Sequence, residues 1–113
     1  MALTYATVEG VLLTASAGTI YTAPSTVLVS VVRSIAIANS DTADRGVALF
    51  LMPSAGTASV TTCIRSSSTA NAVGAGTTEL WDTQLFIAPS GKLQALASVS
   101  SVVSIRLAVV AIS

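Results

Sequence analysis

Short runs of Val, Ile and Leu alternate with small or polar residues along this chain, and clusters of Gly, Pro, Asn and Ser separate the runs. A period of two residues is typical of β-strands, because successive side chains of a strand point to opposite faces of a sheet. The pattern predicts almost no helix. It predicts strands over residues 10–14, 19–21, 27–38, 47–52, 59–65, 77–81, 84–87, 93–97 and 102–112.

The two longest predicted strands are apolar on both faces. In 27–38 the odd-numbered apolar residues are expected to share one face: Val27, Val29, Val31, Ile35 and Ile37. Arg33 interrupts this row, which indicates a β-bulge near Val31 and Val32 that turns the arginine to the surface. In 102–112 the side chains of Ser104 and Arg106 are expected to point outward, and four others inward: Val103, Ile105, Leu107 and Val109.

Many short strands separated by Gly and Pro turns, within 113 residues, are typical of an all-β domain. We therefore predict that residues 1–113 form a single-domain antiparallel β-sandwich that is jelly-roll-like. Residues 1–10 show no clear pairing pattern and are expected to form an N-terminal arm. Residues 66–76 consist of small side chains and are expected to form a flexible loop.

The composition adds a reason to look for a partner. Hydrophobic residues make up 52% of the chain, charged residues only 9%, and the net charge is zero, whereas a soluble domain carries about 25% charged residues. The apolar runs 26–39 and 102–112 contain Arg33 and Arg106, so neither predicts a membrane-spanning helix. Five scattered Lys and Arg residues form no patch for nucleic acid. We therefore expect a neighbouring subunit to cover the second apolar face of the long strands.

The residues that carry most enzyme chemistry are missing. The chain has no His and one Cys, which excludes Ser-His-Asp and Cys-His nucleophiles and zinc sites built from several cysteines. Cys63 is expected to be a small buried apolar side chain. We predict no catalytic residue, no cofactor and no metal site, and hence no enzyme.

The sequence leaves alternatives open for the turn that contains Asp41 and Asp44 and for Trp81. Asp41 and Asp44 lie in the sequence NSDTADRG, which favours a polar turn over a calcium loop. Glu79 and Asp82 flank Trp81. Trp81 is expected to be either a core anchor or an interface hot spot.

Several segments resemble small all-β virion proteins of tailed bacteriophages. The resemblance spans about residues 17–112 and is carried, in order, by AGTIYTAPS (17–25), IAIANSD (35–41), VALFLMP (47–53), GTTEL (76–80) and GKLQALA (91–97). These segments are strand and turn sequences, so the resemblance implies a fold and a virion role but transfers no catalytic residue. The turn Ser90-Gly91-Lys92 departs from the Pro-Gly-Asp expected at that place.

The resemblance implies a capsid decoration (cement) protein, located in the virion after assembly in the host cytoplasm. Its partners would be further copies, with a trimer favoured, and the major capsid protein or other virion subunits. The alternatives are a head-tail connector, tail or fibre-attachment subunit, and a small carbohydrate-binding module with Trp81, Tyr5 and Tyr21 as platforms. The residues expected at the interface are Tyr5, Val8, Trp81, Arg33 and Arg106.

Overall fold

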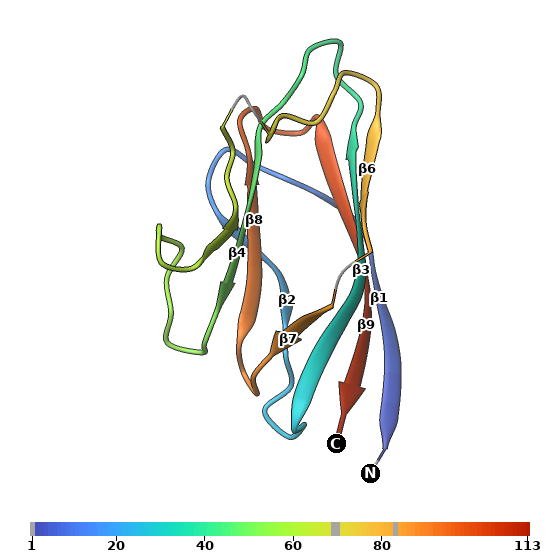
Figure 1. Ribbon diagram of the computed structural model, residues 1–113, viewed down its shortest axis with the longest axis vertical. Helices are drawn as coiled ribbons and strands as arrows, with labels where there is room; N and C mark the ends of the chain where they lie inside the picture. Colours follow the sequence, from blue (N-terminus) through green and yellow to red (C-terminus); the bar gives the residue numbers. More distant parts are fainter. Residues whose placement is uncertain (1, 69–70, 83) are drawn as a thin grey trace.

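The computed structural model describes residues 2–68, 71–82 and 84–113, and these residues are almost entirely strands and turns (Figure 1). The strands are β1 (Leu3–Leu12), β2 (Gly18–Thr22), β3 (Val29–Asn39), β4 (Val47–Met52), β5 (Cys63–Arg65), β6 (Thr78–Trp81), β7 (Leu85–Ile87), β8 (Lys92–Ala97) and β9 (Val103–Ile112). The molecule is elongated, with principal extents of 45 × 25 × 20 Å. No helix in the described ranges is long and apolar enough to cross a bilayer.

The strands form two antiparallel sheets that face each other. Sheet A has the order β1-β9-β3-β6, with β7 also paired to β3, and sheet B has the order β2-β8-β4-β5 (Figure 1). The pairs are nested along the chain: β1 pairs with β9, β2 with β8, β3 with β6 and β7, and β4 with β5. A long hairpin rolled up in this way is a jelly roll, so the predicted fold class is confirmed.

The core lies between the inner faces of the two sheets. β9 contributes Val103, Ile105, Leu107 and Val109, as the alternation predicts. The buried residue Ser30 lies among apolar side chains, and its Oγ is 3.0 Å from the Tyr21 hydroxyl of the opposite sheet. This hydrogen bond joins the sheets and satisfies a hydroxyl that burial would otherwise leave unpaired.

A bulge in β3 changes which side chains point inward. The register with β9 shifts between Val32 and Ser34, so Arg33 is the extra residue and its side chain is exposed. The predicted bulge is thus confirmed, one residue further along. Because an extra residue reverses the alternation, Val32 and Ile35 both lie in the core. The prediction that the odd-numbered residues share one face is therefore wrong before the bulge, where Val31 points outward.

The N-terminal arm was a wrong prediction. Residues Leu3–Leu12 form β1, the outer strand of sheet A, paired with β9 from Leu3–Ile112 to Leu12–Ser104. The alternation of apolar and polar residues is weak there because most of β1 is exposed on both faces. Backbone hydrogen bonds to β9, which have no signature in the side-chain pattern, hold the strand in place.

Two further segments differ from the prediction or refine it. The strand expected over 59–65 begins only at Cys63, because Thr62 Oγ1 donates to Thr57 O (2.9 Å) and closes a turn before it. Within the expected loop 66–76, Val73 is buried and pairs with Arg45 in an isolated bridge. Residues 69–70 of that loop lie outside the described residues.

Candidate interaction surface

The outer face of sheet A has an apolar end built from cross-strand rows. One row crosses four strands in register and contains Tyr5, Val110, Val31 and Phe86. The next row contains Leu3, Ile112 and Val29. We call these seven residues the apolar end. The β3 bulge is what brings Val29 and Val31 to this face, so the surface depends on one inserted residue.

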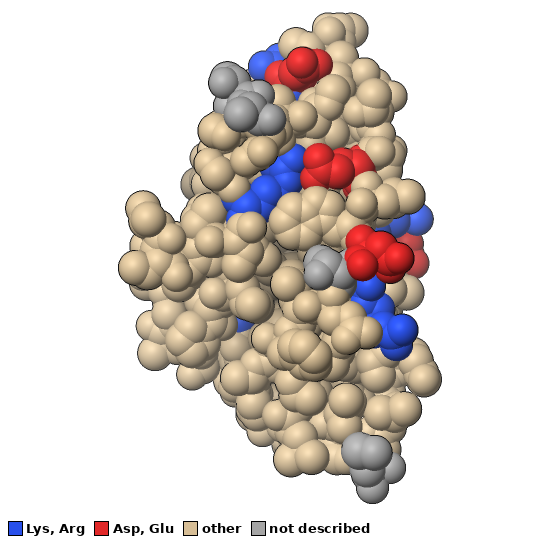
Figure 2. All heavy atoms as spheres, in the orientation of Figure 1, with Lys and Arg blue, Asp and Glu red and all other residues tan. Residues whose placement is uncertain are grey.

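The apolar end combines covered and exposed side chains. Val31 and Val110 are 6% and 7% exposed although they point away from the core. Their neighbours Tyr5 and Phe86 are 73% and 62% exposed, and Leu3 is 50% exposed. In the view of Figure 2 the charged side chains lie over the upper and middle parts of the molecule, and the lower end shows none. Contiguous exposed apolar surface of this kind marks a site of association.

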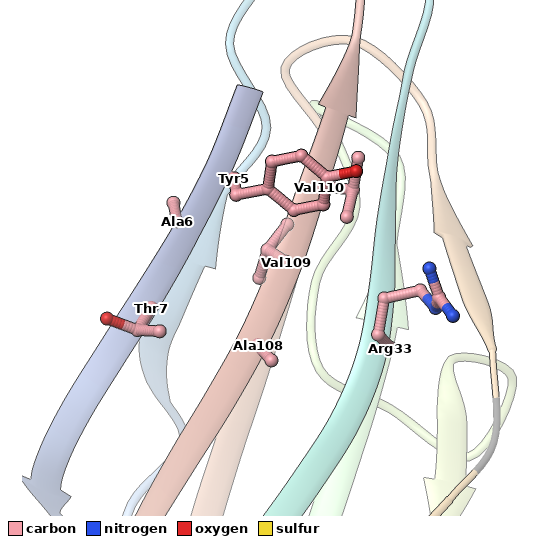
Figure 3. A pocket seen from close by; sticks show the side chains of 7 residues that line it. All are labelled: Tyr5, Ala6, Thr7, Arg33, Ala108, Val109 and Val110. Carbon is pink, nitrogen blue, oxygen red and sulfur yellow. The ribbon is translucent and has the colours of Figure 1, made fainter. Parts of the chain in front are cut away.

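A shallow pocket of about 400 Å³ lies beside Tyr5 on this face. Its lining comes from β1, β9 and the β3 bulge: Tyr5, Ala6, Thr7, Arg33, Ala108, Val109 and Val110. Figure 3 shows the Tyr5 ring reaching from β1 across β9, while the Arg33 side chain extends from β3 away from β9. The structure thus brings two predicted interface residues, Tyr5 and Arg33, to one surface, and the Arg33 guanidinium lies at its border.

The other predicted interface residues lie elsewhere. Val8 is half-buried and packs against the core, so its side chain belongs to the inner face of sheet A. Arg106 is exposed on the outer face, with Nη1 3.5 Å from Glu9 Oε2. Both groups of this ion pair are about two-thirds exposed (66% and 71%). Solvent screens such a pair, so it contributes little to stability.

Trp81 belongs to a polar cluster that joins the sheets. Its Nε1 donates to Glu79 Oε2 (2.7 Å), and its ring packs against the core. The buried Arg65 donates from Nε and Nη2 to the two Glu79 oxygens (both 3.1 Å) and also to the carbonyl oxygens of Val47 and Asn71. Burial raises the pKa of Glu79, but the hydrogen bonds from Arg65 and Trp81 and the Arg65 charge outweigh it, so the pKa lies below its usual value.

A second polar cluster organises the turn after β3. The Asn39 amide nitrogen donates to Ala43 O (3.0 Å) and Val73 O (2.9 Å), and its oxygen accepts from Asp41 N (3.0 Å). Arg45 Nη2 lies 2.6 Å from Asp41 Oδ2. The hydrogen bond from Arg45 lowers the pKa of Asp41. These contacts support the polar turn, and no group of three or more His, Cys, Asp or Glu that could hold a metal occurs in the described ranges.

The three aromatic residues considered as sugar platforms, Tyr5, Tyr21 and Trp81, do not gather at one site. Tyr21 is half-buried with its hydroxyl at Ser30, and Trp81 packs against the core through β6, whereas Tyr5 lies exposed on β1. A sugar platform needs exposed rings around one cleft, and this arrangement does not offer one. Cys63 is half-buried, and its Sγ donates to Arg65 O (3.2 Å).

The prediction from sequence missed most of the apolar end. Phe86 and Leu3 are not among the residues expected at the interface, and Val31 does not share a face with Ile35 and Ile37 as the alternation predicts. A usable signal is present in β9, where Val109 and Val110 are adjacent apolar residues in an alternating strand. One of two such neighbours must point outward. The partners of Val110 across the face depend on register, which the sequence does not display.

No protein-family model matches this chain, and no curated protein matches it. Among solved structures, it is similar to a chain in the structure of infectious bursal disease virus Gx strain, with a TM-score of 0.45 and 17% identity over 96% of this chain. The similarity covers 32% of that viral chain, so this protein spans about a third of its length. A similarity this low carries no argument about function.

Proposed function

We propose that this chain is a non-enzymatic structural subunit of a phage particle, a capsid decoration (cement) protein that stabilises the capsid by burying apolar surface against neighbouring subunits. The apolar end of sheet A is the observation that carries this proposal. It supports a packing role because its most exposed members, Tyr5, Phe86 and Leu3, are large apolar side chains on one face, with Val110 and Val31 between Tyr5 and Phe86 in the same row.

The energetics favour association through this surface. Fully burying one large apolar side chain contributes about 1.5–3 kcal/mol, so a few of them supply much of a stable interface. When a surface carries charged groups, the free-energy cost of removing them from water opposes docking. It is small here because none of the seven residues of the apolar end carries a charge.

The charged groups support a non-enzymatic role. Arg65 and Glu79 are engaged in joining β5 to β6, and Asp41 and Arg45 hold a turn. These contacts give the buried Arg65 and the half-buried Glu79, Asp41 and Arg45 a structural role. The chain also has no His, the most common general base.

The assignment to a tailed-phage particle rests on the resemblance of residues 17–112 to virion proteins. A capsid exterior is the site proposed first. In the alternative role, as a head-tail connector or tail subunit, the same apolar surface would be buried between subunits that form a ring in place of a surface lattice.

The test uses particles of the phage whose genome encodes this chain, purified with and without the gene. Mass spectrometry should find the chain in the complete particles. The purified chain should rebind saturably to particles that lack it, and electron cryomicroscopy should place it on the capsid exterior. Density at the portal vertex or tail would select the connector or tail role. Absence of the chain from complete particles would refute the virion role.

Matched variants connect the binding to the surface. Tyr5→Ser/Phe86→Ser should weaken rebinding at least about tenfold, because it removes two apolar side chains from the contact. Leu80→Ser is the control. Leu80 is 75% exposed on the same sheet but pairs with Ala36, away from the apolar end. Equal loss in both variants would show that the apolar end is not the contact.

A further inference from the structure

β1 presents a long open edge. It is the last strand of sheet A, and on the side away from β9 no described strand pairs with it. β1 has 10 residues, whereas the other outer strands β2, β5, β6 and β7 have 5, 3, 4 and 3. An open edge is a row of backbone donors and acceptors that another strand can bind.

The register shows which backbone groups face this edge. Ala2 and Ser113 exchange two hydrogen bonds, N to O at 3.0 and 2.9 Å. In an antiparallel pair, residues that bond across the pair alternate with residues that point away. Even-numbered residues from Ala2 to Val8 therefore bond to β9. The N–H and C=O groups of Leu3, Tyr5 and Thr7 point to the open edge.

The first half of this edge lacks the devices that usually prevent pairing. Residues 3–8 have the sequence LTYATV, with no charge and no proline. The register shift in β1 comes only after Val8. Thr4 and Ala6, on the inner face, are exposed like Tyr5 on the outer face, so this half of β1 extends past the cover of sheet B. Neither face of the strand hinders a neighbour.

We propose that this edge pairs antiparallel with β1 of a second copy of the chain, around a twofold axis at Tyr5. Tyr5 then lies opposite Tyr5 of the second copy, and Leu3 opposite its Thr7. This register places all the outward backbone groups of Leu3, Tyr5 and Thr7 in hydrogen-bonded pairs. It also joins the two apolar ends into one row across both sheets A.

Among the edge strands that a second copy offers, its β1 fits this edge best. With the twofold at Tyr5, residues 3–7 of one β1 face residues 3–7 of the other, and these segments carry no charge that could repel. A twofold contact closes on itself and yields a dimer, in place of the trimer that the resemblance implies. The pairing concerns the strand edge and does not depend on the virion role.

Sedimentation equilibrium of the purified chain tests the pairing. The wild-type chain should be a dimer, and Tyr5→Lys should raise the dimer dissociation constant at least about tenfold, because two cations then lie opposite each other on the axis. Leu80→Lys adds the same charge at an equally exposed position on β6 and should dimerise like wild type. A wild-type monomer, a trimer or equal weakening by both variants would overturn the proposal.

Disulfide trapping tests the register in a Cys63→Ser background. Hydrogen-bonded antiparallel partners have Cα atoms about 5.5 Å apart, within disulfide range. Tyr5→Cys should therefore give a covalent dimer on mild oxidation, and Leu80→Cys should not. Cross-linking at both positions or only at Leu80→Cys would overturn the twofold at Tyr5. A chain that dimerises but is absent from particles refutes the virion role alone, and a monomer that binds particles refutes the pairing alone.

Discussion

The apolar end and the charged part of this molecule use their side chains in opposite ways. In the charged part, Arg65 is buried and bonds to Glu79 and to backbone carbonyls within the same chain. At the apolar end, Tyr5 and Phe86 are exposed and cover only the valines beside them. Arg65 and Glu79 therefore help to hold the sandwich together, whereas Tyr5 and Phe86 are available to a partner.

This difference shows that exposure and residue type have to be read together. Buried charge and exposed aromatic side chains both run against the usual distribution. The first is explained by internal bonds, because Arg65 has acceptors around it. The second has no internal explanation, and this is why we assign the association role to the apolar end. Substitutions on the two sides should separate folding from assembly.

Arg65→Met should lower the free energy of unfolding by about 3 kcal/mol, because the carbonyls and the carboxylate that it binds lose their donor. Guanidinium unfolding followed by circular dichroism measures this. Arg106→Met is the control, since its ion pair is exposed, and it should change stability by less than about 0.5 kcal/mol. Equal effects would contradict the division between structural and surface charge.

Asn39→Ala should lower the free energy of unfolding by about 2 kcal/mol, because two carbonyls and one amide lose a buried partner. The same unfolding experiment applies. The neighbouring Ser40 is exposed, with a single hydroxyl bond to Val102 O (3.0 Å), and Ser40→Ala should cost about 0.5 kcal/mol. A neutral Asn39→Ala would mean that the turn does not depend on its amide.

Glu79→Gln should change how stability depends on pH. The pKa of Glu79 is lowered in the folded state, so its charge stabilises the fold above the unfolded-state pKa, about 4.3. That contribution is lost as the pH falls through the folded-state pKa. The wild-type chain should therefore be more stable than the variant at pH 7, and the difference should shrink towards pH 3 in unfolding curves. A difference that is the same at both pH values would contradict the ionised pair.

Tyr5→Ser/Phe86→Ser should lower the free energy of unfolding of the monomer by less than about 1 kcal/mol. Both side chains are exposed, so folding buries little of them. Assembly should be lost all the same, as seen by light scattering at a concentration where the wild-type chain associates. A large loss of monomer stability would show that Tyr5 and Phe86 are needed for folding. Full assembly of the variant would show that they are not needed for association.

The side-chain pattern by itself determined the fold class and most strands. In β9 the alternation of Val103, Ile105, Leu107 and Val109 with smaller or polar residues predicts the inner face correctly. Local alternation suffices there because one face is buried along the whole strand. The lone Arg33 also predicts the bulge, since a cation is too costly to bury without a partner.

Tertiary structure alone decided the edge and the surface. β1 is held by backbone pairing, which most residues other than proline can make, so the side-chain pattern does not reveal the strand. The apolar end joins residues from β1, β9, β3 and β7 through register, and register follows from how the whole chain rolls up. The sequence determined that this protein has more apolar surface than one core needs. Only the packing of the sheets decided where that surface lies, because residues distant in the chain must meet to form it.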